Sequence, residues 1–393
     1  MNIFIIGWFG AGNIGDEAIL LSEVLAIRER VKGSRFFILS FNRERTKRLT
    51  ENISEVDRII GFNSKDKFFR SDFKGLLSAF KNADAVIIGG GGIFQDIYNY
   101  YPIPFFSAMA LMARLFRKQL VFHSVGIGPI QSSFSRILCR MAADSAQMIS
   151  VRDAESKELL REIGVKKEIQ VTADPVFLLR SMCSDKIDTL MEKQKTDRDI
   201  PAIGVCVQNL FPWSKENKKA LAGALDILAG ERKARIVFVP FGVYQDGWFH
   251  GAGSEPIDVT ASKELAGMLK SEHSIMTSHT TPEETMAAIG RTDIVISMRL
   301  HGIIMGISMG VPVVALTYGN EPKIRSLMER AGRGEDVFYT DSLDAGKLAD
   351  RMGEIISRNE EFRRDIGDKA RYLKREAEKG IELLSGKLSQ PSC

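Results

Sequence analysis

The sequence predicts an α/β protein with two doubly wound parallel sheets, and two observations carry this prediction. Short apolar runs of strand length recur between longer helical patterns, and the series starts again after a polar segment in the middle of the chain. Apolar runs without strict alternation indicate strands that are covered on both faces. Repeated strand–helix units indicate a parallel sheet with helices on both sides. The 393 residues, 44% of them hydrophobic, are enough for two ordinary cores.

The first series predicts an N-terminal Rossmann-like domain over residues 1–182. Its apolar runs predict strands at 2–7, 35–41, 57–61, 84–89, 119–124, 147–151 and 168–172. The patterns between these runs predict helices at 16–30, 72–82, 104–117, 133–144 and 154–163. Ligands bind outside the carboxyl ends of such strands, so each strand end is a candidate site.

The second series predicts a C-terminal Rossmann-like domain over residues 201–342. Its strands are expected at 202–208, 235–240, 274–276, 293–297 and 312–317, and its helices at 215–230, 260–271, 281–290, 301–309 and 322–332. The polar segment 183–200 predicts a linker or a domain-exit helix, and the charged segment 343–393 predicts a helical tail. Two such domains that face an interdomain cleft form the GT-B architecture, and we expect this GT-B-like fold here.

Charge and composition exclude several classes of protein. The net charge of +4 is too small to indicate nucleic acid as a partner. The cysteines are widely spaced and lack a C-x-x-C pattern, so we expect buried thiols in a reducing compartment: Cys139, Cys183, Cys206 and Cys393. No residues show metal-ligand spacing, and no apolar run approaches the roughly 20 residues of a membrane span. We therefore expect a cytoplasmic protein with no metal and no cofactor.

The first strand end carries the glycine pattern G-x-G-x-x-G within residues 10–15, which can indicate a dinucleotide site. Asp16 and Glu17 follow directly and would repel phosphates at the beginning of the helix. The end of the second predicted strand, residues 41–45, lacks the acid that is usual there in dinucleotide sites, although its arginines leave NADP open as a ligand. Asp16 either caps the helix or faces a cleft, where a carboxylate can bind sugar hydroxyls or accept a proton from one.

The end of the fourth predicted strand carries four successive glycines at 89–92, followed by Asp96. Such a run lets a ligand approach the backbone closely, and the alternative is a tight turn with a surface aspartate. His123, on the next strand, is expected to be a strand-face histidine rather than a catalyst. The aromatic and apolar segment 98–120 predicts a helix buried on the sheet, with peripheral contact at the inner face of a membrane as the alternative.

Basic side chains follow three later strands. Arg152 leaves a strand just before a helix that Asp153 can cap, and Arg299 and His301 follow a buried strand directly. Lys323 stands at a helix start one strand further on. An arginine fork or an ammonium there can bind an anion, and a histidine can act as a general acid or base. An Arg–Asp surface pair, a structural histidine and a solvated lysine are the alternatives.

At these residues the sequence resembles the polysaccharide pyruvyltransferase family. Seven motifs occur in order: GNIGDEAIL (12–20), GGGGIFQD (89–96), GIGPI (126–130), SVRDAES (150–156), TADPVF (172–177), SMRLHG (297–302) and EPKI (321–324). The resemblance implies a GT-B-like fold and transfer of pyruvate from phosphoenolpyruvate to a sugar, commonly as a ketal. It implies a glycan or lipid-linked acceptor of a cell-surface polysaccharide, and it leaves the acceptor sugar and the oligomeric state open.

The resemblance also implies roles for matching residues. His301, Arg152 and Asp16 would be catalytic, with Arg152 acting together with the histidine. The donor would bind to Arg299, Leu300 and Lys323. The acceptor side would contain Gly12, Asn13, Gly15, Gly89, Gly90, Gly91, Gly92 and Asp96. On this interpretation the acids of the opening loop serve a sugar, while the donor anion lies on basic residues across the cleft.

The sequence departs from the family pattern at three places. Gly302 stands where relatives often have serine, residues 318–323 replace a Y-D-P-K pattern, and segment 211–219 lacks an arginine. These departures affect the position of Lys323 and the acceptor side. A GT-B glycosyltransferase that uses a nucleotide sugar, a non-catalytic glycan-binding protein and an NADP oxidoreductase remain the alternatives.

Overall fold

The computed structural model describes residues 1–62, 72–97, 100–192, 200–209, 213–242, 255–276, 280–319 and 321–390. The chain forms two compact units, which confirms the expected α/β fold with two parallel sheets. Unit 1 contains Met1–Ala11, Asp16–Leu179 and Lys374–Cys393, and unit 2 contains Gly12–Gly15 and Arg180–Leu373. Within the described ranges, no helix is long and apolar enough to cross a membrane.

The sheet of unit 1 is parallel throughout its described strands. These are β1 (Asn2–Ile6), β2 (Arg35–Ser40), β3 (Val56–Gly61), β4 (Ala85–Gly89), β5 (Gly92–Phe94), β6 (Gln119–Ile127), β7 (Met148–Val151) and β8 (Gln170–Val171). Their order is β3-β2-β1-β4-β6-β7-β8, and β5 pairs with β6. Strands β1, β4 and β6 are almost entirely buried, as their apolar runs predict.

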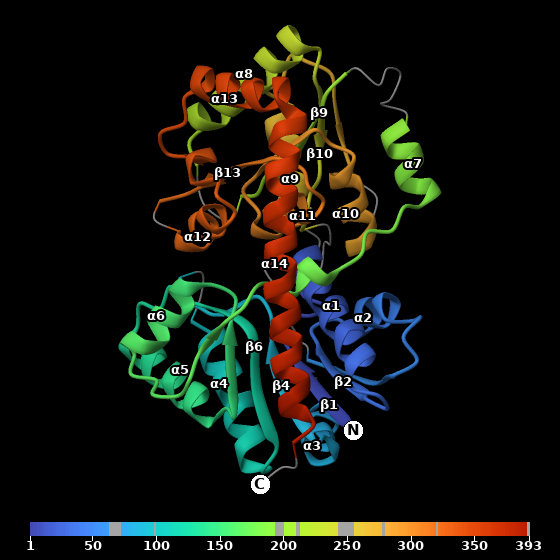
Figure 1. Ribbon diagram of the computed structural model, residues 1–393, viewed down its shortest axis with the longest axis vertical. Coiled ribbons are helices and arrows are strands. Elements are labelled where there is room, and N and C mark those ends of the chain that lie inside the picture. The colour runs from blue at the N-terminus through green and yellow to red at the C-terminus, as the bar shows by residue number, and fades with distance from the viewer. Residues whose placement is uncertain are drawn as a thin grey trace. The chain divides into compact units, whose positions relative to one another are not determined.

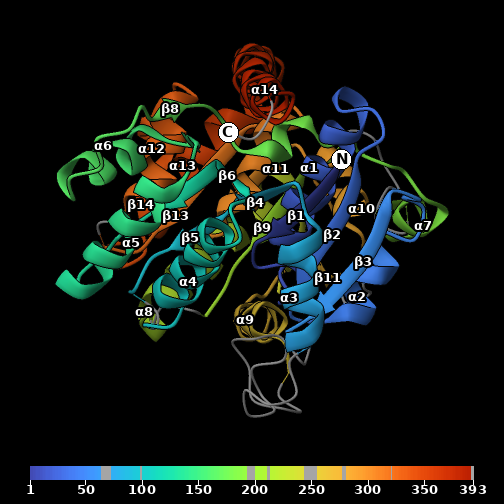
Figure 2. The ribbon, with the colours of Figure 1, turned by 90° about the horizontal axis from the view of Figure 1, so that it is seen from below.

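Helices cover both faces of this sheet. They are α1 (Ile14–Arg30), α2 (Arg43–Leu49), α3 (Phe73–Asn82), α4 (Pro102–Leu115), α5 (Ser133–Ser145) and α6 (Ala154–Glu162), with a short 3-10 helix, η2 (Pro175–Leu178). Figure 2 shows α3, α4 and α5 on one face, and α1 with the C-terminal part of α14 on the other. Helix α4 buries Ile103 and Phe106 against the sheet, which confirms the buried-helix interpretation of segment 98–120.

Unit 2 repeats the design with the strand order β11-β10-β9-β12-β13-β14, again all parallel. The strands are β9 (Ala202–Cys206), β10 (Arg235–Phe238), β11 (His273–Ile275), β12 (Ile294–Ser297), β13 (Val313–Thr317) and β14 (Val337–Tyr339). The helices are α7 (Asp185–Glu192), α8 (Lys215–Arg232), α9 (Ile257–Ala266), α10 (Pro282–Gly290), α11 (Leu300–Ser308), α12 (Pro322–Arg330), η3 (Gly334–Asp336) and α13 (Ala345–Ser357).

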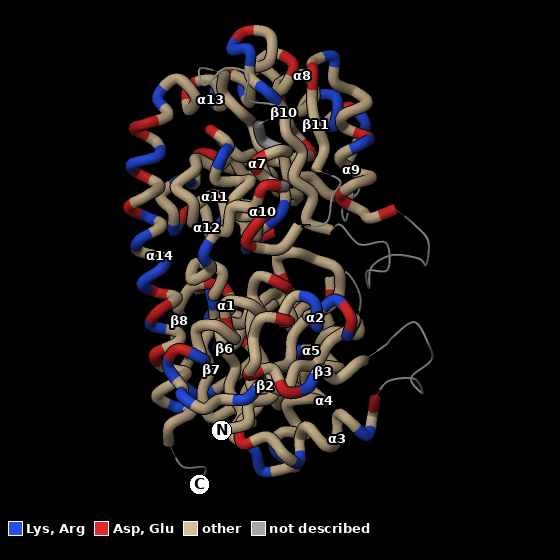
Figure 3. Tube along the Cα trace, turned by 90° about the vertical axis from the view of Figure 1, so that its right-hand side faces the viewer, with Lys and Arg blue, Asp and Glu red and all other residues tan. Residues whose placement is uncertain are grey.

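The described part of the C-terminal segment, residues 343–390, is largely helical, but it is not a separate tail. Helix α13 contributes Leu348, Met352 and Ile355 to the core of unit 2. Helix α14 (Asn359–Leu388) is one continuous helix, drawn in red in Figure 1, and its residues are divided between the two units at Leu373 and Lys374. Figure 3 shows basic and acidic residues interspersed along α14. The apolar residues between these charges give the segment its place in both cores.

Helix α7 lies in segment 183–200, where a domain-exit helix was one of the two alternatives, and it buries Ile187. Two differences from the sequence predictions are local. Cys139 and Cys206 are buried as expected, but Cys183 is exposed at the passage into unit 2. Strands β5 and β14 and helix α2 were not predicted, since each is too short to show a periodicity. Some predictions lie outside the described residues: those on 98–99, 193–199, 211–212, 320 and 393.

Candidate functional site

The strongest local sequence signal lies at one edge of the second sheet. Strand β12 ends at Ser297, and Arg299 is the N-cap residue of α11, with φ −95° and ψ 123°. Strand β13 pairs in parallel with β12 and leads to α12, which begins at Pro322 and Lys323. Because both helices begin at the carboxyl ends of neighbouring strands, Arg299, His301 and Lys323 belong to the same edge. His301 and Lys323 are both buried there.

Arg299 is held by a carboxylate that the sequence analysis did not identify. Its Nε donates to Oδ2 of Asp258 at 2.8 Å, and its Nη2 donates to Oδ1 of the same residue. Asp258 is completely buried in the first turn of α9. Its Oδ2 also accepts from the backbone N–H of Phe241 at 3.0 Å and of Gly242 at 2.9 Å. An aspartate in the first turn of a helix is common because it interacts favourably with the helix dipole, so the sequence carried no signal for this ion pair.

The Gly12–Gly15 loop lies against the same edge within unit 2. The N–H of Ile14 donates to the carbonyl of Phe241 at 3.0 Å, and Asn13 forms an antiparallel bridge with Gly242. A Cβ added at Gly15 would overlap the imidazole of His301 and would lie 2.8 Å from its Cβ. The structure therefore brings the G-N-I-G and R-L-H motifs together, and it explains why residue 15 lacks a side chain.

Gly302, where relatives often have serine, has a local explanation. Ser297 Oγ donates to the carbonyl of Arg299 at 2.8 Å and accepts from its N–H at 3.0 Å. A Cβ at Gly302 would overlap this hydroxyl and would lie 3.3 Å from Cβ of Cys206. Ser297 thus fills the space beside the helix start, and only glycine fits at 302.

Arg152 lies in unit 1 and is buried, so it is not part of an Arg–Asp surface pair. Its Nη1 donates to Oδ2 of Asp174 at 2.9 Å, while Asp153 caps α6 by accepting from the N–H of Ser156 at 2.8 Å. A Cβ at Gly126 would come within 2.9 Å of the guanidinium. The TADPVF motif thus supplies the carboxylate that holds the arginine of the SVRDAES motif.

The glycine run of residues 89–92 lets helix α1 approach the first sheet. Gly90 and Gly91 have left-handed φ angles of 60° and 73°, which favour glycine. A Cβ at Gly91 would lie 3.2 Å from Oδ1 of Asp16, and one at Gly90 would overlap Ile19. Asp16 lies in the first turn of α1. The run therefore permits close packing, and the acceptor role of these glycines stays a prediction.

Asp96 has a structural role that its predicted acceptor role did not include. Its two carboxylate oxygens accept from the N–H of Gln131 at 2.7 Å and of Ser132 at 3.0 Å. Asp96 is buried, so its carboxylate orders the loop before α5. We therefore leave Asp96 out of the proposed site.

Glu17 occupies the backbone group that a dinucleotide phosphate would need. Its Oε1 accepts from the N–H of Gly10 at 2.8 Å, and Arg45 Nη1 donates to the Gly10 carbonyl at 2.7 Å. Burial raises the pKa of Glu17 to about 7, although Arg45 and the Gly10 N–H act in the opposite direction. Arg45, one of the two arginines that left NADP open, is thus used inside the protein, whereas Arg43 is exposed.

His123 is a buried strand histidine, as expected. Its Nδ1 lies 2.8 Å from Oε1 of Glu23, and both side chains are almost fully inaccessible. Burial raises the pKa of Glu23, although the hydrogen bond from His123 lowers it. This pair lies between α1 and β6 and holds the interior of unit 1 together.

Comparison with known proteins first defines the class. The Anabaena protein HepE, solved in complex with UDP and glucose, aligns with a TM-score of 0.64 at 16% identity, over 99% of each chain. A UDP-GlcNAc 2-epimerase from Neisseria meningitidis aligns with a TM-score of 0.61 at 13% identity, again over 99% of each chain. At these identities the likeness shows the fold alone, and it confirms the GT-B-like prediction.

The family follows from the sequence match. Residues 13–320 match the family described as polysaccharide pyruvyl transferase, and the chain belongs to that family. The amylovoran biosynthesis protein AmsJ of Erwinia amylovora is 22% identical over 295 residues, which cover 73% of this chain and 68% of AmsJ. The predicted resemblance is confirmed, and a role in polysaccharide biosynthesis is supported.

Proposed function

We propose that this protein transfers pyruvate from phosphoenolpyruvate to a sugar of a cell-surface polysaccharide or its lipid-linked precursor, forming a ketal. One observation carries the proposal: Arg299, His301 and Lys323 share one edge of the second sheet, beside the Gly12–Gly15 loop, in a chain of this family. We place the reaction in the cytoplasm, with no cofactor, and a lipid-linked acceptor would bring the protein to the inner face of the membrane.

The basic groups suit a donor that carries both a phosphate and a carboxylate. Asp258 engages Nε and Nη2 of Arg299, so an incoming anion would bind through Nη1. Lys323 supplies a second cation from the beginning of the neighbouring helix. The N-termini of α11 and α12 add partial positive charge at the same edge. Leu300 follows Arg299 directly and would line the donor site as the first residue of α11.

The chemistry balances without a redox partner. A proton reaches the methylene carbon C3 of phosphoenolpyruvate, and C2 becomes cation-like. One sugar hydroxyl forms a bond to C2, the bond between C2 and the phosphate oxygen breaks, and a second hydroxyl closes the ketal. Of the two hydroxyl protons, one replaces the proton used at C3 and the other leaves with phosphate. Positioned charge at the developing cation and at the leaving phosphate should be the largest catalytic contribution.

His301 is our candidate for the acid that protonates C3, because it follows Arg299 by two residues and its ring lies against Gly15. Asp16 follows Gly15 and would orient or deprotonate the acceptor, together with the loop residues Gly12 and Asn13. We assign Arg152 to the same reaction as a catalytic residue, because it falls on the arginine of the V-R-D motif of the family.

Calorimetry with phosphoenolpyruvate tests the donor. We expect binding to the wild type, at least tenfold weaker binding to Arg299→Ala, and retained binding to His301→Ala. UDP and GDP are titrated in parallel, because HepE was solved with UDP and glucose. Tight UDP or GDP binding without phosphoenolpyruvate binding, also in the presence of glycosides, would replace the pyruvyl donor with a nucleotide sugar.

A panel of aryl glycosides then tests the acceptor. Transfer raises the mass of the glycoside by that of pyruvic acid less water and releases phosphate. A ketal shows a methyl singlet in the proton spectrum, whereas an enol ether shows vinyl protons, so the spectrum identifies the product. His301→Ala should lose about 10²–10⁴-fold in rate; full activity of that variant would remove the histidine from the mechanism.

A further inference from the structure

We infer that Asp258 is a positioning residue of this site: it fixes the guanidinium of Arg299 and, through the backbone at Phe241 and Gly242, the Gly12–Gly15 loop beside His301. The consequence for donor binding rests on the proposed function. The positioning itself rests only on contacts within unit 2.

The ion pair sets the direction of the arginine. Two parallel hydrogen bonds, from Nε and from Nη2 to one carboxylate, leave a planar guanidinium little freedom to rotate. The side chain of Asp258 is completely buried and that of Arg299 is only 13% exposed, so water competes weakly for these bonds. A Cβ at Gly242 would lie 3.3 Å from Oδ1 of Asp258 and 3.4 Å from Nη2 of Arg299, and the missing side chain lets the backbone close over the pair.

The same carboxylate organises the backbone that holds the opening loop. Asp258 accepts from the N–H groups of Phe241 and Gly242, and these two residues are the ones that pair with the loop. The Phe241 carbonyl accepts from Ile14, and Gly242 bridges to Asn13. The residue after Ile14 is Gly15, which has room for the imidazole of His301 only because it lacks a side chain. One buried acid thus links the Arg299 segment to the glycine loop.

Asp336 provides a matched control in the same unit. It is also almost completely buried, and it accepts from Nε of Arg333 at 2.8 Å and from Nε of Arg351 at 2.6 Å. It lies in η3, between helix α12 and strand β14. Asp258→Asn and Asp336→Asn therefore remove equivalent charges, and only the first removes one that binds Arg299 and the loop backbone.

The experiment compares both variants with wild type by hydrogen exchange and by calorimetry with phosphoenolpyruvate. We expect Asp258→Asn to raise amide exchange in peptides that cover residues 7–15 and 236–242 by about tenfold or more, and to weaken phosphoenolpyruvate binding at least tenfold. Asp336→Asn should change neither, even if it lowers the melting temperature. Asp258→Glu, which retains the charge on a longer side chain, replaces Asp258→Asn if the latter fails to fold, and it should show the same pattern.

The outcomes separate the inference from the proposed function. Unchanged exchange at residues 7–15 and 236–242 in the Asp258 variants would overturn the positioning role, whatever happens to the donor. Equal weakening of phosphoenolpyruvate binding by both asparagine variants would also overturn it, because general destabilisation would then explain the loss. If the wild type does not bind phosphoenolpyruvate, the proposed donor fails, and the exchange data alone decide the role of Asp258.

Discussion

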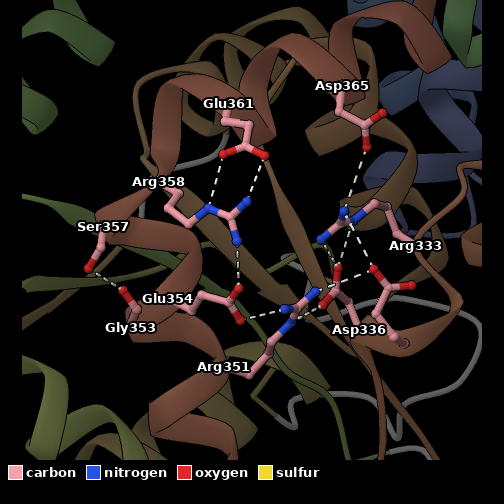
Figure 4. A network of polar contacts seen from close by, with 10 residues as sticks. Arg333, Asp336, Arg351, Gly353, Glu354, Ser357, Arg358, Glu361 and Asp365 are labelled. Atoms are coloured by element: carbon pink, nitrogen blue, oxygen red, sulfur yellow. Dashed lines mark hydrogen bonds and ion pairs between the residues drawn. The ribbon is translucent and has the colours of Figure 1, made fainter.

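Arg299 and Arg333 both lie in unit 2 and both bind a buried aspartate, yet their surroundings differ. Arg299 binds Asp258, and Oδ2 of Asp258 also accepts from the backbone N–H groups of Phe241 and Gly242, which hold the Gly12–Gly15 loop. Arg333 meets Asp336 in a network that also includes Arg351, Glu354, Arg358, Glu361 and Asp365, as Figure 4 shows. Asp258 thus holds one arginine beside one backbone segment, whereas the network distributes its charges among η3, α13 and the beginning of α14.

The network rests on an aromatic ring. The guanidinium carbons of Arg333, Arg351 and Arg358 lie 4.4, 5.5 and 5.6 Å from the ring centroid of Phe362, which itself belongs to the core of unit 2. Cation–π contacts of this kind hold η3, α13 and the beginning of α14 together. Several of its acids, such as Glu354 and Glu361, are half exposed, so the ion pairs of these acids contribute little individually. The difference teaches that the network serves stability, while the Arg299 pair serves placement.

The largest expected effect removes the ring beneath the network. Phe362→Ala should lower the free energy of unfolding of unit 2 by about 3–5 kcal/mol, because it deletes a buried aromatic side chain and leaves three arginines without their ring. Phosphoenolpyruvate affinity of the folded variant should remain unchanged. Denaturant unfolding followed by near-UV circular dichroism measures the first quantity, and calorimetry measures the second.

Phe73→Ala is the control for this prediction, because Phe73 is 55% exposed at the beginning of α3 and should cost much less. If Phe362→Ala kept its free energy of unfolding but lost phosphoenolpyruvate binding, the network would serve the site and not stability.

The two regions also differ in how far the sequence could predict them. The apolar strand before Arg299 and the apolar helix after His301 indicate a buried strand that ends at these residues. The position of Arg299 and His301 at the carboxyl end of a strand was therefore predictable from the sequence. Asp258 was not, because it is 41 positions from Arg299 in the chain and no local pattern marks a tertiary ion pair. Arg351, Glu354, Arg358, Glu361 and Asp365 lie in the segment that was predicted as a helical tail, because charges in a helical pattern do not show which acid each arginine will meet.

The opening loop shows the same limit from another side. The glycine spacing and the following acids argued against a nucleotide phosphate, but they did not show the tertiary contacts of this loop. Glu17 and Arg45 bind the N–H and the carbonyl of Gly10, and Gly15 makes room for a side chain nearly 290 residues further along the chain. A sequence can show that a residue is small, but only the fold shows what takes the space.

The second effect in size concerns Glu17, a buried acid whose neighbouring arginine binds a backbone carbonyl. Its pKa in the folded protein is about 7, raised by burial from 4.5, with Arg45 lowering it and Asp16 raising it. Between these two values the folded state binds more protons than the unfolded state, so the contribution of Glu17 to stability decreases as the pH rises. The full loss is about 3 kcal/mol above pH 7.

Glu17→Gln removes this dependence. We expect the stability of the variant relative to wild type to be lowest near pH 5 and to rise by about 2–3 kcal/mol by pH 8. Melting temperatures of both proteins measured across this range give the difference, in which groups common to both, such as Glu23, cancel. A constant difference would show that Glu17 titrates normally and that its carboxylate is accessible to water.

The smallest of the three effects tests the placement of His301 directly. Gly15→Ala puts a methyl group where the imidazole lies, so the ring or the beginning of α1 must move. A displacement of about 1 Å at a catalytic group can cost about 100-fold in rate, equivalent to roughly 2.7 kcal/mol. We expect this loss in phosphate release from phosphoenolpyruvate with the acceptor found in the glycoside panel, while donor affinity changes less than tenfold.

The control is Gly230→Ala, because Gly230 is exposed in α8 and nothing lies within 4 Å of its added Cβ. This variant should gain up to about 1 kcal/mol in stability and keep its rate. If Gly15→Ala kept the wild-type rate, the close approach of Gly15 and His301 would have no part in catalysis. The Arg299–Asp258 pair would then differ from the Arg333 network in its contacts but not in its role.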